Sequence, residues 1–312
     1  MRILFITCSR LGDAVLTTNV LNYLVQTYPQ AKYTIVTNEL TSSIFEAVPN
    51  LEKLIKVEKS PYKLHWFKIW WKVFFMRWDK VVDLRNTVIS RILFSKKTYI
   101  KQSAPNLHKI QENIKVLGIT ENIPPKIWIS DEVYARVSEY VSFDEEYICI
   151  APTANWIGKE WPPEYFAKLI IKMMDSQKGF LPKMPIVVLG AKHERERILE
   201  LFEILKQFDV LDRVGVFEPI ESAACIAKAK FFIGNDSGLM HISWAMNTKT
   251  FALFGPGFPN RYGPLGIHAH IIETDTPSVE LREQASQSNL KGQSLMLSLP
   301  VEKVFKSINK NL

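Results

Sequence analysis

The feature that most constrains this chain is the stretch 230–256, in which two short apolar runs flank a segment with helical character. Residues 231–233 and 250–254 are apolar runs typical of buried strands. The sequence between them predicts a turn at 234–235 and a helix over 239–246. A strand, a turn, a helix and a second strand in this order are typical of an α/β fold.

The start of the expected helix is suited to bind a phosphate. Asp236 or Ser237 can cap it, and the first backbone N–H groups of a helix have no partner and lie at its positive end. The amides of Ser237, Gly238 and Leu239 are therefore well placed for a phosphate, and Gly238 lets a ligand approach closely. His241 follows about one turn later, where its ring can point back at the same ligand. The alternative is an ordinary helix cap, which every α/β protein contains.

Short strands alternate with helices along the rest of the chain. Strands are expected at residues 1–7, 33–37, 54–57, 80–84, 98–100 and 147–151. A Pro-Pro pair and acidic residues 144–146 interrupt the alternation, and we place a domain boundary there. The predicted fold is α/β, with two Rossmann-like domains of parallel strands, residues 1–143 and 144–312, in the GT-B arrangement whose active site is the cleft between the domains. A last helix at 300–308 could pack back on the first domain.

Composition narrows the class of protein. With 312 residues, 47% hydrophobic and 23% charged, the chain is globular and long enough for two domains. The apolar start is too short for a signal peptide, and no apolar run nears the ~20 residues of a membrane-spanning helix, so we expect a cytoplasmic protein.

Three scattered cysteines without a Cys-x-x-Cys pair indicate neither a disulfide framework nor a zinc site. The net charge of +7 favours anionic partners, and the lack of a nucleic-acid-binding motif favours anionic lipid or phosphorylated sugars over nucleic acid.

The loop 8–13 joins the end of the first expected strand to the start of a helix. Open α/β sheets bind ligands at such junctions. The loop contains neither Gly-x-Gly-x-x-Gly nor a Walker sequence, which disfavours a dinucleotide or ATP site. Asp13 is either a first-turn acid favoured by the helix dipole or a carboxylate that takes a proton from an attacking hydroxyl. Arg10 is a further candidate for contact with an anion.

Two later loops at the ends of expected strands carry further candidates. Lys159, after the strand at 147–151, is either an ordinary exposed lysine or a flexible point charge for a diphosphate. Glu194 lies in the loop 190–195, which is either a solvated helix start or a place where an acid accepts hydrogen bonds from ribose hydroxyls.

The segment 61–79 is unusually aromatic and basic. As a helix it has an apolar face that Trp66 and Trp70 widen beyond the need of a surface helix, while Lys68 and Lys72 lie on another face. These four residues are candidates for contact with a membrane surface or an acceptor. The alternative is an ordinary core helix, and both hold if one side packs and the rim stays exposed.

Four motifs together resemble glycosyltransferase family 9, the bacterial lipopolysaccharide heptosyltransferases. They are Arg10-Leu11-Gly12-Asp13, Lys159-Glu160-Trp161-Pro162, Gly190-Ala191-Lys192-His193-Glu194 and Asp236-Ser237-Gly238-Leu239-Met240-His241. The similarity covers nearly the whole chain. It implies transfer of a heptose, typically from ADP-heptose, to the inner core of lipopolysaccharide, with inversion at the anomeric carbon and without a bound metal or other cofactor. The chain agrees on the metal, because it has no Asp-x-Asp pair to hold a divalent ion.

The resemblance also implies roles for single residues. Asp13 is implied as the general base. Donor contacts are implied for Lys159, Glu194, Asp236, Ser237, Gly238, Leu239 and His241. The implied partners are a nucleotide sugar and a lipid-linked oligosaccharide acceptor, with the protein bound peripherally at the inner face of the cytoplasmic membrane. The alternatives are a related transferase that uses another nucleotide sugar and a non-catalytic membrane-surface binding protein of the same fold.

Overall fold

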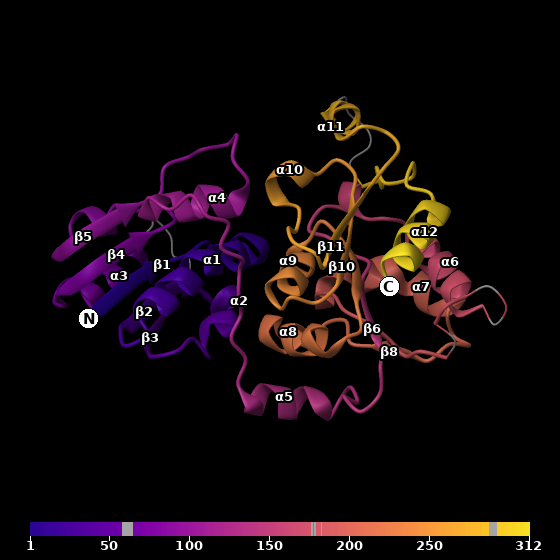
Figure 1. Ribbon diagram of the computed structural model, residues 1–312, viewed down its shortest axis with the longest axis horizontal. Coiled ribbons are helices and arrows are strands. Elements are labelled where there is room, and N and C mark those ends of the chain that lie inside the picture. Colours follow the sequence, from indigo (N-terminus) through magenta and orange to yellow (C-terminus); the bar gives the residue numbers. More distant parts are fainter. Residues whose placement is uncertain (58–64, 176, 178, 182, 287–291) are drawn as a thin grey trace. The chain divides into compact units, whose positions relative to one another are not determined.

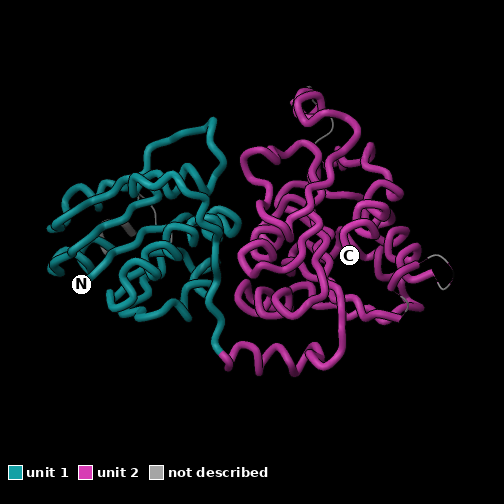
Figure 2. The backbone as a smooth tube through the Cα atoms, viewed as in Figure 1, with its two compact units in different colours: residues 1–130 teal, residues 131–312 magenta. Residues whose placement is uncertain are grey.

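The chain forms two compact units, Met1–Ser130 (unit 1) and Asp131–Leu312 (unit 2) (Figure 2). The computed structural model describes residues 1–57, 65–175, 177, 179–181, 183–286 and 292–312. The sequence placed the boundary after residue 143. The structure groups helix α5 (Asp131–Ser138) with unit 2, because α5 packs against α8 (Pro219–Lys228) and Arg136 pairs with Glu221 at 3.2 Å.

The described residues of unit 1 form a five-stranded parallel sheet of order β3-β2-β1-β4-β5. Its strands are β1 (Arg2–Ile6), β2 (Lys32–Asn38), β3 (Leu51–Val57), β4 (Trp78–Asp83) and β5 (Ser95–Ile100). Its helices are α1 (Leu11–Thr27), α2 (Glu39–Ser42), α3 (His65–Phe74) and α4 (Lys109–Ile114), with 3₁₀ turns η1 (Ser43–Phe45), η3 (Ile89–Arg91) and η4 (Lys115–Leu117). Each of the five strands expected in this half therefore forms.

The apolar character of β1 explains its central position. Its residues Ile3 to Ile6 are all fully buried, as expected of a parallel strand that is covered on both faces. The chain adds β2 and β3 on one side of β1, then returns to add β4 and β5 on the other. The order reverses between β1 and β4, so the loops that follow these two strands meet at a place where α/β sheets bind ligands.

The described residues of unit 2 form a six-stranded parallel sheet of order β11-β10-β9-β6-β7-β8 (Figure 1). Its strands are β6 (Ile148–Ala151), β7 (Ile186–Val188), β8 (Val210–Asp212), β9 (Phe232–Asn235), β10 (Thr250–Phe254) and β11 (Ala269–Glu273). Besides α5 and α8, its helices are α6 (Pro163–Met174), α7 (Leu199–Ile204), α9 (Gly238–Ala245), α10 (Pro259–Tyr262), α11 (Ser278–Ser286) and α12 (Val301–Asn311), with 3₁₀ segments η5 (Ile157–Lys159) and η6 (Lys192–Ile198).

The stretch 230–256 forms the strand, helix and strand that its pattern predicts. The expected turn at 234–235 is wrong, because both residues belong to β9. Gly234 pairs in register with Ala151 of β6 and Ala252 of β10. A Cβ atom on Gly234 would lie 2.7 Å from the ring of Phe232, so glycine lets the strand continue through this crowded position. The helix then begins at Gly238, directly after the two-residue link.

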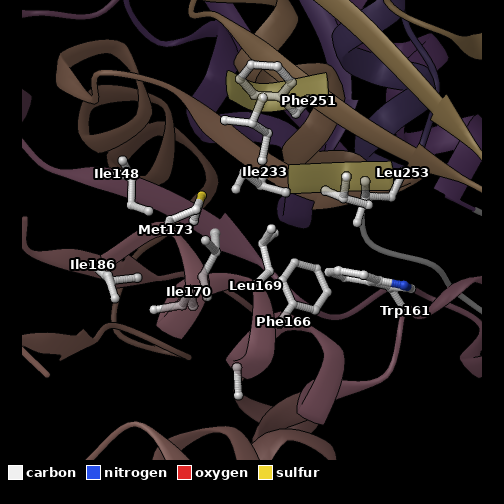
Figure 3. Close-up of a cluster of buried hydrophobic side chains, with 14 of the residues drawn as sticks. Ile148, Trp161, Phe166, Leu169, Ile170, Met173, Ile186, Ile233, Phe251 and Leu253 are labelled. Carbon is white, nitrogen blue, oxygen red and sulfur yellow. The ribbon is translucent and has the colours of Figure 1, made fainter. Parts of the chain in front are cut away.

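The core of unit 2 lies between its sheet and helix α6 (Figure 3). Apolar residues of α6 recur at helical spacing, and the buried ones are Phe166, Ala167, Leu169, Ile170 and Met173. They face buried residues of the strands, among them Ile148, Ile233 and Leu253. This packing makes the sheet a rigid base for the loops at its carboxyl ends.

The last helix belongs to unit 2. Helix α12 lies beside α6 (Figure 1), and its residues Val304 and Ile308 are fully buried in the unit 2 core. Lys249 also donates a hydrogen bond to the carbonyl of Asn311 at 2.6 Å. The helix that the sequence allowed to pack on the first domain thus completes the second.

A membrane-spanning segment was not expected from the sequence. Among the residues that the structure describes, no helix combines the length and the apolar character needed to cross a bilayer.

We predict that Leu253→Ala lowers the free energy of unfolding by about 2–5 kcal/mol, because it removes a fully buried side chain from the unit 2 core. The matched control is Leu199→Ala at a position that is 51% exposed, where we expect a change within about 0.5 kcal/mol. Urea unfolding of both variants measures the difference. Equal losses would contradict the packing described here.

Candidate functional site

The strand order of unit 2 defines where a ligand can bind. The chain builds β6, β7 and β8 toward one edge and β9, β10 and β11 toward the other, so the order reverses between β6 and β9. This is the order of doubly wound nucleotide-binding sheets, which bind ligands beyond the carboxyl ends of the strands at the reversal. The predicted donor residues follow β6 and β9, except Glu194, which follows β7.

Two of these residues form an ion pair. Lys159 ends the 3₁₀ segment η5 after β6, and Asp236 directly follows β9. Lys159 Nζ lies 2.5 Å from Asp236 Oδ2, with the Asp236 side chain 6% exposed and that of Lys159 25% exposed. A Cβ atom on Gly257 would lie 2.5 Å from the same oxygen, so the loop after β10 also approaches the pair closely. The carboxylate therefore holds the lysine ammonium next to the start of α9.

The start of α9 has groups available for an anion. Ser237 is its N-cap residue, in extended conformation, but its side chain makes no capping hydrogen bond. Ser237 Oγ is a buried oxygen without a hydrogen-bond partner among the residues that the structure describes. Gly238 and Leu239 open the helix, where backbone N–H groups lack partners within the helix. The hydroxyl and these amides can together hold a phosphate.

His241 lies on the first turn of α9, as the sequence predicted. Its side chain is buried, with 5% exposure, and its backbone N–H donates to the Ser237 carbonyl at 3.4 Å. This hydrogen bond joins the first turn of the helix to its N-cap residue.

Glu194 joins the loops after β6 and β7. Its Oε2 accepts hydrogen bonds from Thr153 Oγ1 at 2.7 Å and from the Ala191 amide at 2.8 Å. Its Oε1 lies 3.3 Å from the Arg197 guanidinium. A Cβ atom on Gly190 would lie 3.2 Å from Thr153 Oγ1, so the absence of a side chain there keeps the two loops close. In this arrangement Glu194 anchors the site.

Sequence reasoning missed two polar residues that hold the same loops. Glu160 is buried, and its Oε1 accepts from the Ala154 amide at 2.7 Å and from the Arg197 guanidinium. Burial raises the pKa of the Glu160 carboxyl, and these two donors oppose that shift. Asn235 is fully buried; its side chain accepts from the Trp161 amide at 3.0 Å and donates to the Pro152 carbonyl at 2.8 Å. A polar residue at the end of an apolar strand was the available signal for Asn235.

The Gly- and Pro-rich stretch after β10 is held by α11. Arg282 donates to the carbonyls of Pro256 and Gly257 at 3.1 and 3.0 Å, and its guanidinium carbon lies 3.9 Å from the centre of the Phe258 ring. The stretch contains one short helical turn, α10, which begins at Pro259. The loop is therefore fixed next to Asp236.

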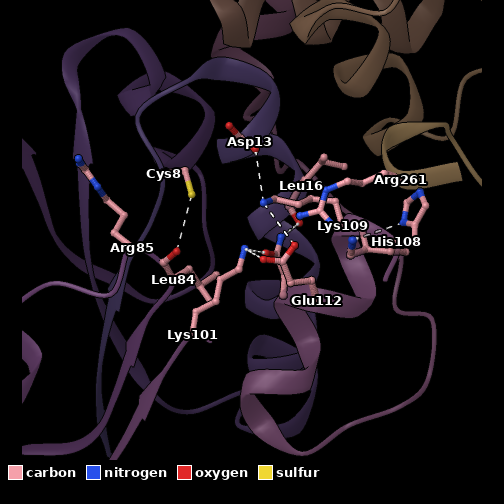
Figure 4. A network of polar contacts seen from close by, with 12 residues as sticks. Cys8, Asp13, Leu16, Leu84, Arg85, Lys101, His108, Lys109, Glu112 and Arg261 are labelled. Carbon is pink, nitrogen blue, oxygen red and sulfur yellow. Dashed lines mark hydrogen bonds and ion pairs between the residues drawn. The ribbon is translucent and has the colours of Figure 1, made fainter. Parts of the chain in front are cut away.

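Asp13 lies close to the strand-order reversal of the unit 1 sheet, because it follows β1. It lies in the first turn of α1, after the loop that follows β1, with its side chain 29% exposed. Arg10 is the exposed N-cap residue of the same helix. Lys109 Nζ, at the start of α4, lies 4.0 Å from Asp13 Oδ1 (Figure 4). Asp13 is thus a partly exposed carboxylate with a cation beside it.

A buried charge network supports this cation. Glu112 Oε2 lies 3.5 Å from Lys109 Nζ, and its Oε1 lies 3.3 Å from Lys101 Nζ (Figure 4). Lys101 also donates to Asn113 Oδ1 at 2.6 Å. Burial and the neighbouring Lys109 ammonium lower the pKa of Lys101, whereas the Glu112 carboxylate raises it. One buried carboxylate thereby holds two lysines, one of which is next to Asp13.

The structure describes the side chains of two of the four candidates in the segment 61–79. Helix α3 ends at Phe74, so the segment 61–79 is a helix only in part. Trp70 is half-buried and Lys72 is exposed. The side chains of Trp66 and Lys68 lie outside the part of the chain whose side chains the structure describes.

No metal site was predicted from the sequence. Across the described ranges, no three His, Cys, Asp or Glu side chains are grouped so that they could hold a metal ion.

The fold and the site together define the class of protein. Two parallel-sheet α/β units, the second with a candidate anion site at its strand-order reversal, make up a GT-B fold. Two solved structures share it: Escherichia coli ADP-heptose lipopolysaccharide heptosyltransferase II, with a TM-score of 0.77, 19% identity and coverage of 100% of this chain and 98% of that chain, and E. coli heptosyltransferase WaaC with ADP, with a TM-score of 0.74, 21% identity and 100% coverage of both chains.

The sequence then identifies the family. Residues 77–291 match the sequence model of glycosyltransferase family 9 (heptosyltransferase). Lipooligosaccharide heptosyltransferase 2 of Campylobacter jejuni is 25% identical over 324 residues, covering 96% of each chain. Lipopolysaccharide heptosyltransferase 1 of E. coli is 24% identical over 322 residues, covering 91% of this chain and 98% of the relative. The chain belongs to glycosyltransferase family 9 and is a glycosyltransferase, as the four motifs predicted.

We predict that Asn235→Ala lowers the free energy of unfolding by about 2–4 kcal/mol, since it leaves the buried Trp161 amide and Pro152 carbonyl without partners. Asn260→Ala, the same change at an exposed position of unit 2, should alter it by less than about 0.5 kcal/mol. Chemical unfolding of both variants measures this. If Asn235→Ala is as stable as the wild type, these hydrogen bonds do not fix the loop.

Proposed function

We propose that this glycosyltransferase moves a heptose from ADP-heptose to the inner core of a lipopolysaccharide acceptor, with inversion at the anomeric carbon and without a metal ion. We further propose that it acts in the cytoplasm, peripherally at the inner membrane. The observation that carries the donor assignment is the Lys159 ammonium at the start of α9, next to an unused Ser237 hydroxyl. The relatives, which are lipooligosaccharide and lipopolysaccharide heptosyltransferases, and the ADP in the WaaC structure support the choice of donor and acceptor.

Unit 2 supplies the stabilisation of the leaving group. As the glycosidic bond breaks, negative charge builds on the departing ADP. The Gly238 and Leu239 amides and the Lys159 ammonium can interact more strongly with that charge than with the intact donor, which lowers the barrier. These groups provide positive charge at the diphosphate, which is the task that a divalent ion performs in other transferases. We assign Asp236 to positioning Lys159, and Glu194 and His241 to the donor site.

Unit 1 supplies the base. We assign Asp13 to accept the proton of the acceptor hydroxyl as that oxygen attacks the anomeric carbon. A single attack on the face opposite the leaving ADP inverts the configuration. The Lys109 ammonium lies 4.0 Å from Asp13 Oδ1, beside the proposed base. Arg10, exposed beside Asp13, remains a candidate for an anionic group of the acceptor.

We predict that Asp13→Asn lowers kcat by about 10²–10⁴-fold, because it removes the proton acceptor, and leaves the Kd for ADP unchanged. Lys159→Met should instead weaken ADP binding by about 10–100-fold, since it removes a charged hydrogen-bond donor from the diphosphate. ADP release from ADP-heptose with an inner-core acceptor measures turnover, and calorimetry measures ADP affinity. Asp144→Asn, at an exposed acid, is the control.

Four outcomes would contradict the proposal. Unchanged turnover of Asp13→Asn would remove the assignment of the base. Unchanged ADP binding by Lys159→Met would remove the assignment of the diphosphate site. In a panel of nucleotide sugars, release from a UDP-sugar alone would replace ADP-heptose as the donor, and turnover of none would favour the non-catalytic binding protein.

A further inference from the structure

Unit 1 carries a cluster of four aromatic rings, three of them exposed, that the proposed chemistry does not use. We call Trp71, Phe74, Phe75 and Phe94 the aromatic surface. Trp71, Phe75 and Phe94 are 58%, 71% and 67% exposed. The rings are in contact: the centre of Phe75 lies 5.1 Å from that of Trp71 and 5.3 Å from that of Phe74, which lies 5.5 Å from Phe94. The four residues thus form one continuous patch from two separate segments.

The aromatic surface is additional to the packed face of the same helix. Ile69 and Val73 of α3 are buried in the unit 1 core together with Trp78 of β4. Helix α3 therefore already has the apolar contacts that hold it on the sheet. Its exposed aromatic residues add nothing to that packing, and a contiguous exposed apolar patch of this kind is typical of an interaction site.

Positively charged residues lie next to the aromatic surface along the chain. Residues 69–100 contain seven Lys or Arg and two Asp. One of the two, Asp83, is fully buried, and the other, Asp79, lies 2.6 Å from Lys96. Lys72 and Arg77 are exposed, and the Trp78 amide donates to the Phe94 carbonyl at 3.1 Å, which places Arg77 next to the patch along the chain. The accessible charge around the rings is therefore positive.

We propose that the aromatic surface docks unit 1 on an anionic lipid bilayer. Trp71, Phe75 and Phe94 insert at the boundary between headgroups and acyl chains, and Lys72 and Arg77 contact anionic headgroups. The inference rests on the proposed function in one respect, namely that the acceptor is anchored in a membrane. It keeps Lys72 from the assignment made from the sequence and adds the exposed rings of Trp71 and Phe75, whereas Trp70 is half-buried.

Charge favours lipid over a second copy of this chain as the occupant. A symmetric dimer through the aromatic surface would bring the same patch of each copy together, and with it the same lysine and arginine side chains. Like charges brought close together repel. An anionic bilayer instead pairs these cations with phosphate groups, so it satisfies both the apolar and the charged parts of the surface.

The test is co-sedimentation of the full chain with vesicles of phosphatidylcholine, with and without phosphatidylglycerol. We expect binding only to the anionic vesicles, weakening as salt is added. Trp71→Ala with Phe75→Ala should reduce the partition coefficient by about tenfold or more, because two inserted rings are lost. The control pair is Leu199→Ala with Ile267→Ala, exposed apolar residues of unit 2, and it should bind as the wild type does.

The outcomes separate this inference from the proposed function. Calorimetry with ADP should give the same Kd for the aromatic variant and the wild type, since neither ring belongs to unit 2. If vesicle binding is lost in the aromatic variant while ADP fails to bind even the wild type, the docking surface stands and the donor assignment falls. If the wild type ignores anionic vesicles, or the aromatic variant binds them equally well, the docking surface is wrong. Dimerisation of the wild type that the aromatic variant abolishes would also overturn it, in favour of a contact between copies.

Discussion

The candidate donor site depends on where the chain places one ammonium group. Lys159 lies in η5 after β6, and Asp236 directly follows β9. The order of the unit 2 sheet reverses between these two neighbouring strands. The 2.5 Å contact between their side chains holds the ammonium at the start of α9 before any anion arrives. A phosphate that binds there meets a charge that is already oriented, so less side-chain entropy is lost on binding. The helix amides add fixed dipoles of the same sign.

The loops that carry this pair are held by buried polar groups. Asn235 and Glu160 satisfy backbone groups of the loop after β6, and Glu194 joins that loop to the one after β7. Buried polar groups of this kind are costly to leave unpaired, which makes the loop conformation specific. In unit 1, Glu112 has a similar effect on Lys109 beside Asp13. Both halves of the molecule thus position a functional charge through a buried carboxylate or amide.

Much of the fold could be predicted from the sequence, because parallel strands that are buried on both faces are mostly apolar, as residues 3–6 of β1 and 251–254 of β10 are. The local sequence pattern did not predict the structure at positions where tertiary contacts determine it. Gly234 suggested a turn, but glycine is needed there because the Phe232 ring of the same strand occupies the space of a side chain. Helix α5 lies before the expected boundary, and only its packing on α8 assigns it to unit 2. The sequence proposed Lys159 and Asp236 as donor residues, but their contact with each other arises from the fold. The same holds for Lys109 and Asp13, which are about a hundred residues apart in the sequence.

The central claim is that the start of α9 and the Lys159 ammonium bind a diphosphate. The measurement that tests it most directly is a crystal structure of the protein with ADP. We expect phosphate oxygens about 2.7–3.2 Å from the Gly238 or Leu239 amide nitrogen, from Ser237 Oγ and from Lys159 Nζ. An ADP diphosphate bound elsewhere, with Lys159 still paired only to Asp236 and the start of α9 without a phosphate, would contradict the account.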